Sequence, residues 1–291
     1  MACMQKTNHQ VTGTGLVIAS ALFFSLSGIF TKMIEADVWT IACWRGLVGA
    51  IFIALYSVHR GEVNLKQLDL GLGWRGLILA SVGSIATLAF IGAFKLTYVA
   101  NVAIIYATAP FMAAVLEYFL RGVRVRHSIL VATAISVLGV GFMVIGGLGT
   151  GHLLGDAIAV FMTFGNALYM VLIKHFRGSP VVMAAALSSV QMFVLGWVFS
   201  DPLAVTADDA MLLLLFGLTF AAAVVLWTEG TRLVTAAESG LFGSAEVPLA
   251  IVLAWLILAD TPPIATLLGG VVVLVAVFGQ AWRDYSSAPQ T

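Results

Sequence analysis

The sequence predicts an all-α membrane protein with ten transmembrane helices in two inverted five-helix repeats. Three observations predict this fold class. Of the 291 residues, 61% are hydrophobic and only 10% are charged, whereas soluble domains have about 25% charged residues. Ten apolar segments come close to the ~20 residues that a helix needs to cross a bilayer. Finally, a proline-containing stretch of the first half of the chain returns in the second half, five segments later.

The predicted spans follow one another with short connections, none of which is long enough to hold a soluble domain. The first span lacks a small-residue cleavage site and is followed at once by a second apolar run. We therefore expect a retained helix rather than a signal peptide. The second span carries an arginine, and the fourth and ninth each carry a proline. In chain order the spans are 13–31, 38–58, 76–94, 98–120, 128–147, 153–173, 180–200, 210–229, 236–258 and 263–282.

Ten spans place both chain termini on the same side of the membrane. Lys and Arg are enriched in cytoplasmic loops, and with the N-terminus inside, eleven of these residues fall on the cytoplasmic side and two on the outer side. We expect a multi-pass protein of the bacterial inner (plasma) membrane with both termini in the cytoplasm. The inner set is Lys6, Arg60, Lys66, Arg75, Arg121, Arg124, Arg126, Lys174, Arg177, Arg232 and Arg283, and the outer set is Lys32 and Lys95.

The fourth span returns as the ninth. VANVAIIYATAPFMAAVLEYFL aligns with AESGLFGSAEVPLAIVLAWLIL, which pairs Pro110 with Pro248 and Asn101 with Ser239. Because five spans carry the chain across the membrane, the second repeat starts from the opposite side and the two halves are inverted. Inverted repeats are a common plan of secondary transporters, which indicates alternating access. The predicted repeats are 1–147 and 148–291.

The paired prolines lie ~18 Å along their helices at the rise of an α-helix, close to the membrane midplane. A proline inside a helix removes one backbone hydrogen bond, and interrupted helices at matched positions in the two halves indicate a binding site. We interpret Pro110 and Pro248 as hinges beside a cavity. The alternative is a packing kink, because proline is fairly common in membrane helices.

The same stretches carry a family resemblance, through ALFFSLSGIFTK, ACWRGLVGA, GAFKLTYVANVAIIYATAPFMAAVLEYFL and EGTRLVTAAESGLFGSAEVPLAIVLAWLILAD. With them the chain resembles the drug/metabolite transporter superfamily, of the ten-helix type with two EamA-like halves, and within it most of all the bacterial aromatic amino acid exporters. The resemblance implies export of amino acids, aromatic ones among them. The family usually has a glutamate just after the fourth and ninth spans. Asp260 takes that place in the second half, whereas the first half has Arg121 and Gly122.

Charged residues inside spans are costly and are candidates for the site. Arg45 lies ~10 Å into its span at helical rise, where a guanidinium would bind a carboxylate in a bidentate way. Its alternatives are snorkelling to the outer surface or a structural pair, and the family arginine at this helix favours the structural interpretation. Glu246, two residues before Pro248, would bind a substrate ammonium or carry a proton, with a hydrogen bond to a neighbouring helix as the alternative. Glu229 and Arg232 have the spacing of a structural i, i+3 pair.

Neutral polar and aromatic residues complete the predicted site. Asn101 and Asn166 need partners in an apolar medium, and joining two helices is the alternative to binding substrate. Tyrosine and tryptophan rings would stack on an aromatic or apolar substrate. We expect a cavity lined by the fourth and ninth spans, with polar contributions from the second, sixth and eighth. The predicted substrate-binding residues are Arg45, Tyr98, Asn101, Tyr106, Asn166, Tyr169, Trp227, Ser239 and Glu246.

Several function classes are not supported by motifs. No GxxxxGK[ST] motif is present, so no ATP site is predicted, and all five histidines lie at or outside span ends, so no metal or other cofactor is expected. The net charge is zero, which does not favour nucleic acid. The expected partners are a small-molecule substrate and the lipid bilayer, with proton coupling left open. The alternatives are a membrane-embedded enzyme, a passive channel and, among carriers, an exporter of drugs or other metabolites.

Overall fold

The computed structural model describes residues 2–60, 73–147, 151–176 and 181–287. These residues form helices and no strands, and the all-α prediction is confirmed. In chain order the helices are α1 (Ala2–Ser25), α2 (Ser27–Met33), α3 (Val38–His59), α4 (Gly73–Leu96), α5 (Val99–Tyr106), α6 (Ala109–Arg121), α7 (His127–Gly146), α8 (Leu153–His175), α9 (Val181–Phe199), α10 (Ala207–Leu233), α11 (Ala236–Gly243), α12 (Glu246–Leu258) and α13 (Ile264–Ser287).

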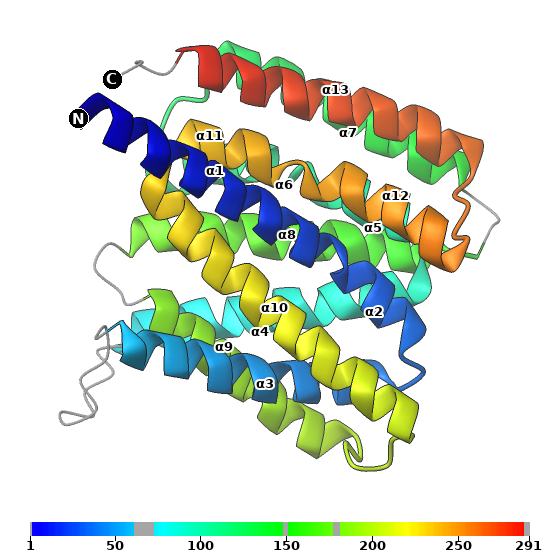
Figure 1. The fold of residues 1–291 in the computed structure, drawn as a ribbon. Coiled ribbons are helices and arrows are strands. Elements are labelled where there is room, and N and C mark those ends of the chain that lie inside the picture. The colour runs from blue at the N-terminus through cyan, green and yellow to red at the C-terminus, as the bar shows by residue number, and fades with distance from the viewer. Residues whose placement is uncertain (1, 61–72, 148–150, 177–180, 288–291) are drawn as a thin grey trace.

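Three of the ten predicted spans consist of two consecutive helices, namely α1 with α2, α5 with α6 and α11 with α12. Among the described residues, nine segments are long and apolar enough to cross a membrane, and the apolar part of α9 is shorter. The predicted boundaries agree with the helices to within a few residues, except that α1 begins well before residue 13. Predicted residue 180 lies outside the described residues. The start of α1 and the end of α13 lie at one end of the bundle (Figure 1), which we call the termini end.

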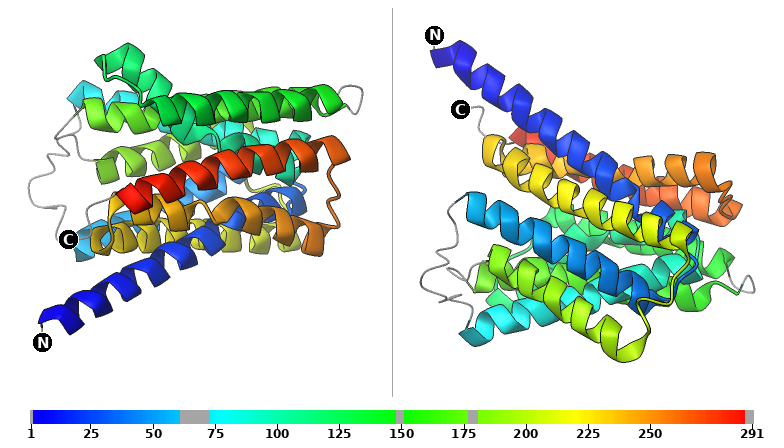
Figure 2. Two further views of the ribbon diagram at one scale, coloured as in Figure 1. Left: turned by 90° about the horizontal axis from the view of Figure 1, so that it is seen from above. Right: turned by 60° about the horizontal axis from the view of Figure 1, so that its bottom comes forward.

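The helices pack as expected for two inverted repeats. The most extensive contacts join α3 to α9, α4 to α8, α1 to α10 and α7 to α13. The inverted repeat relates each span to the span five places away. The third and sixth spans, α4 and α8, are thereby related to the eighth and first, α10 and α1, and the other two pairs are each related to themselves. The helices keep a roughly common direction in the two further views (Figure 2). Each of the four pairs joins a helix of one half to a helix of the other, so the two halves meet along the interior of the bundle.

Close approach at glycine holds some of these pairs together. A Cβ atom at Gly269 of α13 would lie 2.5 Å from the Gly139 carbonyl oxygen of α7, which is closer than real Cβ contacts. Lipid supplies no hydrophobic driving force between membrane helices, so such association depends on van der Waals packing between small residues. The two glycines thus let the fifth and tenth spans meet backbone to backbone.

The fourth and ninth spans are both broken near their middle. α5 ends at Tyr106 and α6 begins at Ala109, while α11 ends at Gly243 and α12 begins at Glu246. At each break one N–H bonds three residues back, from Thr108 to the Ile105 oxygen at 3.1 Å and from Ala245 to the Phe242 oxygen at 3.2 Å. This tighter 3₁₀ step is typical of helix ends.

The position of the two prolines refines the physical reason for the breaks. Pro110 is the second residue of α6 and Pro248 is the third residue of α12. In the first turn of a helix the missing proline N–H costs little, because that group has no intrahelical partner there. The prolines therefore start the second half-helices instead of interrupting continuous ones.

Candidate functional site

A cavity lies in the centre of the bundle and has two adjoining lobes of about 310 and 620 Å³. The two lobes share five lining residues, which come from the first, fourth, sixth and ninth spans. The smaller one, which we call the polar lobe, also contains Arg45 and three serines. The larger one, the wide lobe, extends to Asp284 in the last turns of α13 and so reaches the termini end. The shared residues are Phe24, Tyr106, Asn166, Tyr169 and Glu246.

Arg45 lines the polar lobe, and 93% of its surface is removed from solvent, since its exposed fraction is 7%. Its guanidinium carbon lies 4.0 Å from the centre of the Phe220 ring, 5.4 Å from that of Phe216 and 5.5 Å from that of Phe90. Its Nε and Nη1 atoms have no hydrogen-bond acceptor among the described residues. Cation–π contacts thus stabilise the charge, while two donors remain free for an anionic group.

Glu246 is the first residue of α12, directly after the break in the ninth span. A carboxylate is favoured at this position because the start of a helix carries partial positive charge. The side chain lines both lobes together with Tyr106, which is the last residue of α5 at the break in the fourth span. The two breaks therefore place an acid and a phenol at the junction of the lobes.

Most of the predicted site residues share this cavity. Asn166 and Tyr169 on α8 line both lobes, and the Asn166 amide donates to the Met162 oxygen at 3.1 Å. Trp227 on α10 and Ser239 on α11 line only the wide lobe, as does the hinge candidate Pro110. Helices of the second, fourth, sixth, eighth and ninth spans thus contribute side chains, and the seventh and tenth spans, which the prediction does not include, add polar groups as well.

Asn101 and Tyr98, by contrast, lie outside both lobes, at the end of the bundle opposite the termini. Asn101 is 3% exposed and donates to Asp156 at 2.8 Å, while its own oxygen accepts from Thr266 at 2.9 Å. Tyr98 packs against His152 with the two rings tilted by 57° and their centroids 4.6 Å apart. These positions follow from the packing of α5 between α8 and α13, which places the first turn of α5 in the protein interior. Pro248 also does not belong to the lining.

The lining also contains residues that are absent from the sequence-based prediction. The rings of Phe90 and Phe220 face Arg45, and Phe24 lies where the two lobes meet. Phenylalanines recur throughout the apolar spans, so no spacing signal distinguishes these three from rings that face lipid. Gln280 and Asp284, four residues apart on α13, line the wide lobe as well. Gln280 was a detectable signal, because it lies within the predicted tenth span and polar groups are rare there.

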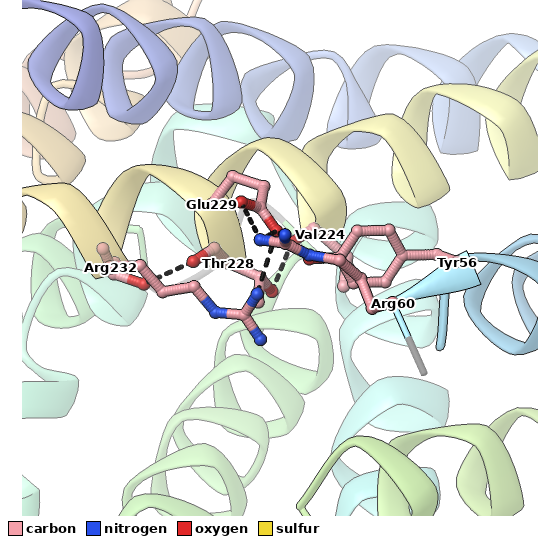
Figure 3. Close-up of polar contacts among 7 residues, drawn as sticks. Tyr56, Arg60, Val224, Thr228, Glu229 and Arg232 are labelled. Atoms are coloured by element: carbon pink, nitrogen blue, oxygen red, sulfur yellow. Dashed lines mark hydrogen bonds and ion pairs between the residues drawn. The ribbon is translucent and has the colours of Figure 1, made fainter. Parts of the chain in front are cut away.

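A separate charged cluster joins α3 and α10 near the termini end (Figure 3). Glu229 accepts hydrogen bonds from Tyr56 and from Arg60, whose Nε lies 3.0 Å away, and pairs with Arg232 at 3.1 Å. The predicted pair of Glu229 and Arg232 is thereby confirmed. Hydrogen bonds with Tyr56 and Glu229 raise the pKa of Arg60 above its ordinary value. None of these residues lines the cavity, so the cluster has a structural role between neighbouring helices.

A ten-span bundle of two inverted halves around a central, partly polar cavity is the architecture of a membrane carrier. The chain belongs to the EamA-like transporter family, which matches residues 11–145 and 153–281. It is therefore a multi-pass membrane transporter of small molecules. A solved chain described only as a crystal structure of a protein is 17% identical, with 93% of this chain and 98% of that chain covered and a TM-score of 0.65, and it shares the fold. No curated protein sequence matches this chain.

Proposed function

We propose that the protein exports amino acids, aromatic ones among them, by alternating access across the bacterial inner membrane. Both termini lie in the cytoplasm in this proposal, because eleven of the loop cations then lie inside. The wide lobe, which reaches the termini end, would then admit substrate from the cytoplasm. The two halves, split as 1–147 and 148–291, would exchange conformations to open the opposite end.

One observation carries this proposal. The Arg45 guanidinium lies in the polar lobe with two donors free and three aromatic rings around it. A carboxylate is the natural partner of such a group, because charge-assisted pairs with arginine are bidentate and strong. The second charged group of the cavity, Glu246, suits the ammonium of the same zwitterion or a coupled proton. The rings of Tyr106, Tyr169 and Trp227 supply surface for an apolar or aromatic side chain.

Purified protein in liposomes tests the substrate class through counterflow. Phenylalanine carries both charges, phenylethylamine lacks the carboxylate, and phenylpropionate lacks the ammonium. We expect saturable counterflow of phenylalanine and no counterflow of the amine. Saturation and counterflow also exclude a passive channel, and transport of drugs instead of phenylalanine would support the alternative exporter class.

Arg45→Gln tests whether the guanidinium binds the substrate carboxylate, and Arg75→Gln is its control. Arg75 also contacts aromatic rings, at 5.6 Å from Trp74, but lies outside the cavity. Hydrogen bonds to charged groups contribute about 1.5–3 kcal/mol, so we expect Arg45→Gln to weaken apparent phenylalanine affinity roughly 10- to 100-fold. Wild-type transport by Arg45→Gln would show that the arginine is structural and would remove the observation on which the proposal depends.

A further inference from the structure

The first turns of α5 and α11 occupy equivalent places at opposite ends of the bundle. Aligning Pro110 with Pro248 pairs these two helices, and α5 begins at the end opposite the termini whereas α11 begins at the termini end. In an inverted repeat, each end of the cavity is closed by one of these equivalent regions. A difference between their contacts is therefore a difference between the two openings of the carrier.

The first turn of α5 is capped by the other half of the molecule. Its N-cap residue, Tyr98, supplies no side-chain hydrogen bond. Instead the Val99 N–H donates to Asp260 at 2.9 Å, and Asp260 lies in the connection between α12 and α13. The first N–H groups of a helix need partners, and a carboxylate suits the positive end of the helix. We call this contact the cross-half cap.

Three further hydrogen bonds between the halves accompany the cross-half cap at the same end. The Thr266 hydroxyl of α13 donates to Asn101 of α5 at 2.9 Å, and both residues are buried. Asn101 is held in orientation by Asp156, which accepts from its amide at 2.8 Å and from Thr97 at 2.7 Å. The end of the bundle opposite the termini is thus closed by packed, hydrogen-bonded side chains.

The first turn of α11 is capped from within its own helix. The Glu238 N–H donates to the Thr235 hydroxyl at 3.2 Å, and the Thr235 N–H donates to the Glu238 carboxylate at 2.8 Å. This reciprocal capping box satisfies both groups locally. Counted from the ends of α6 and α12, the position equivalent to Asp260 is Val123, which carries no carboxylate. α11 can therefore separate from the first half without losing its cap, whereas α5 cannot separate from the second half without losing one.

We propose that Asp260 holds the cavity closed at the end opposite the termini and that, with valine at the equivalent position, the carrier rests open toward the termini. This inference rests on the alternating access proposed above. Opening the far end breaks the contact between Asp260 and Val99, so Asp260 is a positioning residue that acts on the conformational equilibrium. Its effect does not depend on which substrate the cavity binds.

A cysteine at Thr87, in a background with Cys3→Ser and Cys43→Ala, reports the accessibility of the polar lobe. We expect a membrane-impermeant maleimide to label it in sealed vesicles from the termini side and hardly from the other side. Asp260→Ala should raise the rate from the far side and lower it from the termini side. Loss of a helix cap predicts a shift of roughly 2- to 30-fold. A merely destabilised protein would show faster labelling from both sides.

Asp201→Ala is the matched control, since Asp201 lies in a connection at the same end and accepts only locally, from the Leu203 N–H at 3.3 Å. It should leave both rates unchanged, and Asp260→Asn, which keeps an acceptor, should largely restore them. Unchanged rates in Asp260→Ala, or a parallel rise on both sides, would overturn the inference. If Asp260→Ala does not fold, Val123→Asp decides the question: the added carboxylate should lower labelling from the termini side relative to Val123→Ala, and equal rates would overturn the inference.

Labelling needs no substrate, and the sides are defined relative to the termini. A wrong substrate class or a reversed orientation therefore leaves this test intact. Rapid labelling of the unaltered reporter from both sides would contradict alternating access itself and the resting state inferred from it.

Discussion

Arg45 lies with its guanidinium 4.0 Å from the Phe220 ring and with Nε and Nη1 lacking acceptors among the described residues. An arginine in the apolar surroundings of a protein interior is normally paired or bound to a ligand, because an isolated buried charge is costly. The sequence left the structural interpretation of this residue as the favoured one. The three rings and the cavity beside them favour binding instead, and neither feature can be recognised from residue spacing.

A substitution at Glu246 tests the role of the second charged group in the cavity. We expect Glu246→Gln to fold normally and to transport at least ~10-fold more slowly, since hydrogen bonds and pairs with a charged group contribute about 1.5–3 kcal/mol. If the carboxyl carries a proton, an imposed pH gradient should drive transport by the wild type and not by the variant. The measurement is initial uptake into liposomes at several pH values.

Glu117→Gln is the control for this change, because Glu117 pairs with Arg121 at 2.6 Å outside the cavity. It should transport within twofold of the wild type. Normal transport by Glu246→Gln at every pH would remove Glu246 from the site.

At the scale of the element, the broken fourth and ninth spans have the same construction. Each consists of two helices of 8 and 13 residues with the break before a proline. Each also ends in a left-handed residue, Gly122 or Ala259. The breaks bring Tyr106 and Glu246 to the junction of the two lobes. A bend at either break would therefore move the walls of the cavity directly, which is the hinge function that we propose for both spans.

Pro110→Ala and Pro248→Ala test these hinges. Alanine restores a backbone donor and allows a continuous helix, so each variant should fold and bind substrate but exchange it slowly. If stiffening adds about 1 kcal/mol to the barrier, exchange slows about fivefold. Pro263→Ala, in the connection before α13, should have no such effect. Exchange at the wild-type rate in both hinge variants would show that the prolines only pack.

At the scale of the whole molecule, the helix pairs are related by the inverted repeat, but the two ends of the bundle differ in how the cavity is closed. The wide lobe reaches Asp284 at the termini end, whereas the opposite end is closed around Asn101 and Asp156, which are each 3% exposed. Inverted repeats allow two conformations of similar energy, and the contacts that differ between the ends decide which one is populated. The state open to the termini would be the one that receives substrate from the cytoplasm in the proposed orientation.

Single cysteines in a background lacking Cys3 and Cys43 test that orientation. Ala204 is exposed in the connection between α9 and α10, and Ser287 is exposed at the end of α13. On intact cells we expect Ala204→Cys to react with a membrane-impermeant maleimide and Ser287→Cys to react only after permeabilisation. The opposite pattern would reverse the topology, and with it the direction of transport.

The ten spans and the matched prolines were predictable from the sequence, and most of the predicted site residues line the cavity. Span length and hydropathy are local properties, and the repeat with Pro110 and Pro248 is visible in the aligned letters. Glu246 was found because a charged group inside a span beside a helix interruption is a candidate for the site, and Asn166 and Tyr169 because polar and aromatic side chains in a span are candidates to bind substrate.

Only the tertiary structure decided which of these groups meet. Asn101 and Ser239 align in the sequence, yet Asn101 bonds to Asp156 and Thr266 while Ser239 lines the wide lobe. Likewise, Asp260 follows the ninth span, but its partner Val99 lies 161 residues away. Contacts of this kind depend on how helices distant in the chain are placed in space, and hydropathy carries no information about that placement. The sequence thus determined the two equivalent halves, and the packing between them determined that their ends differ.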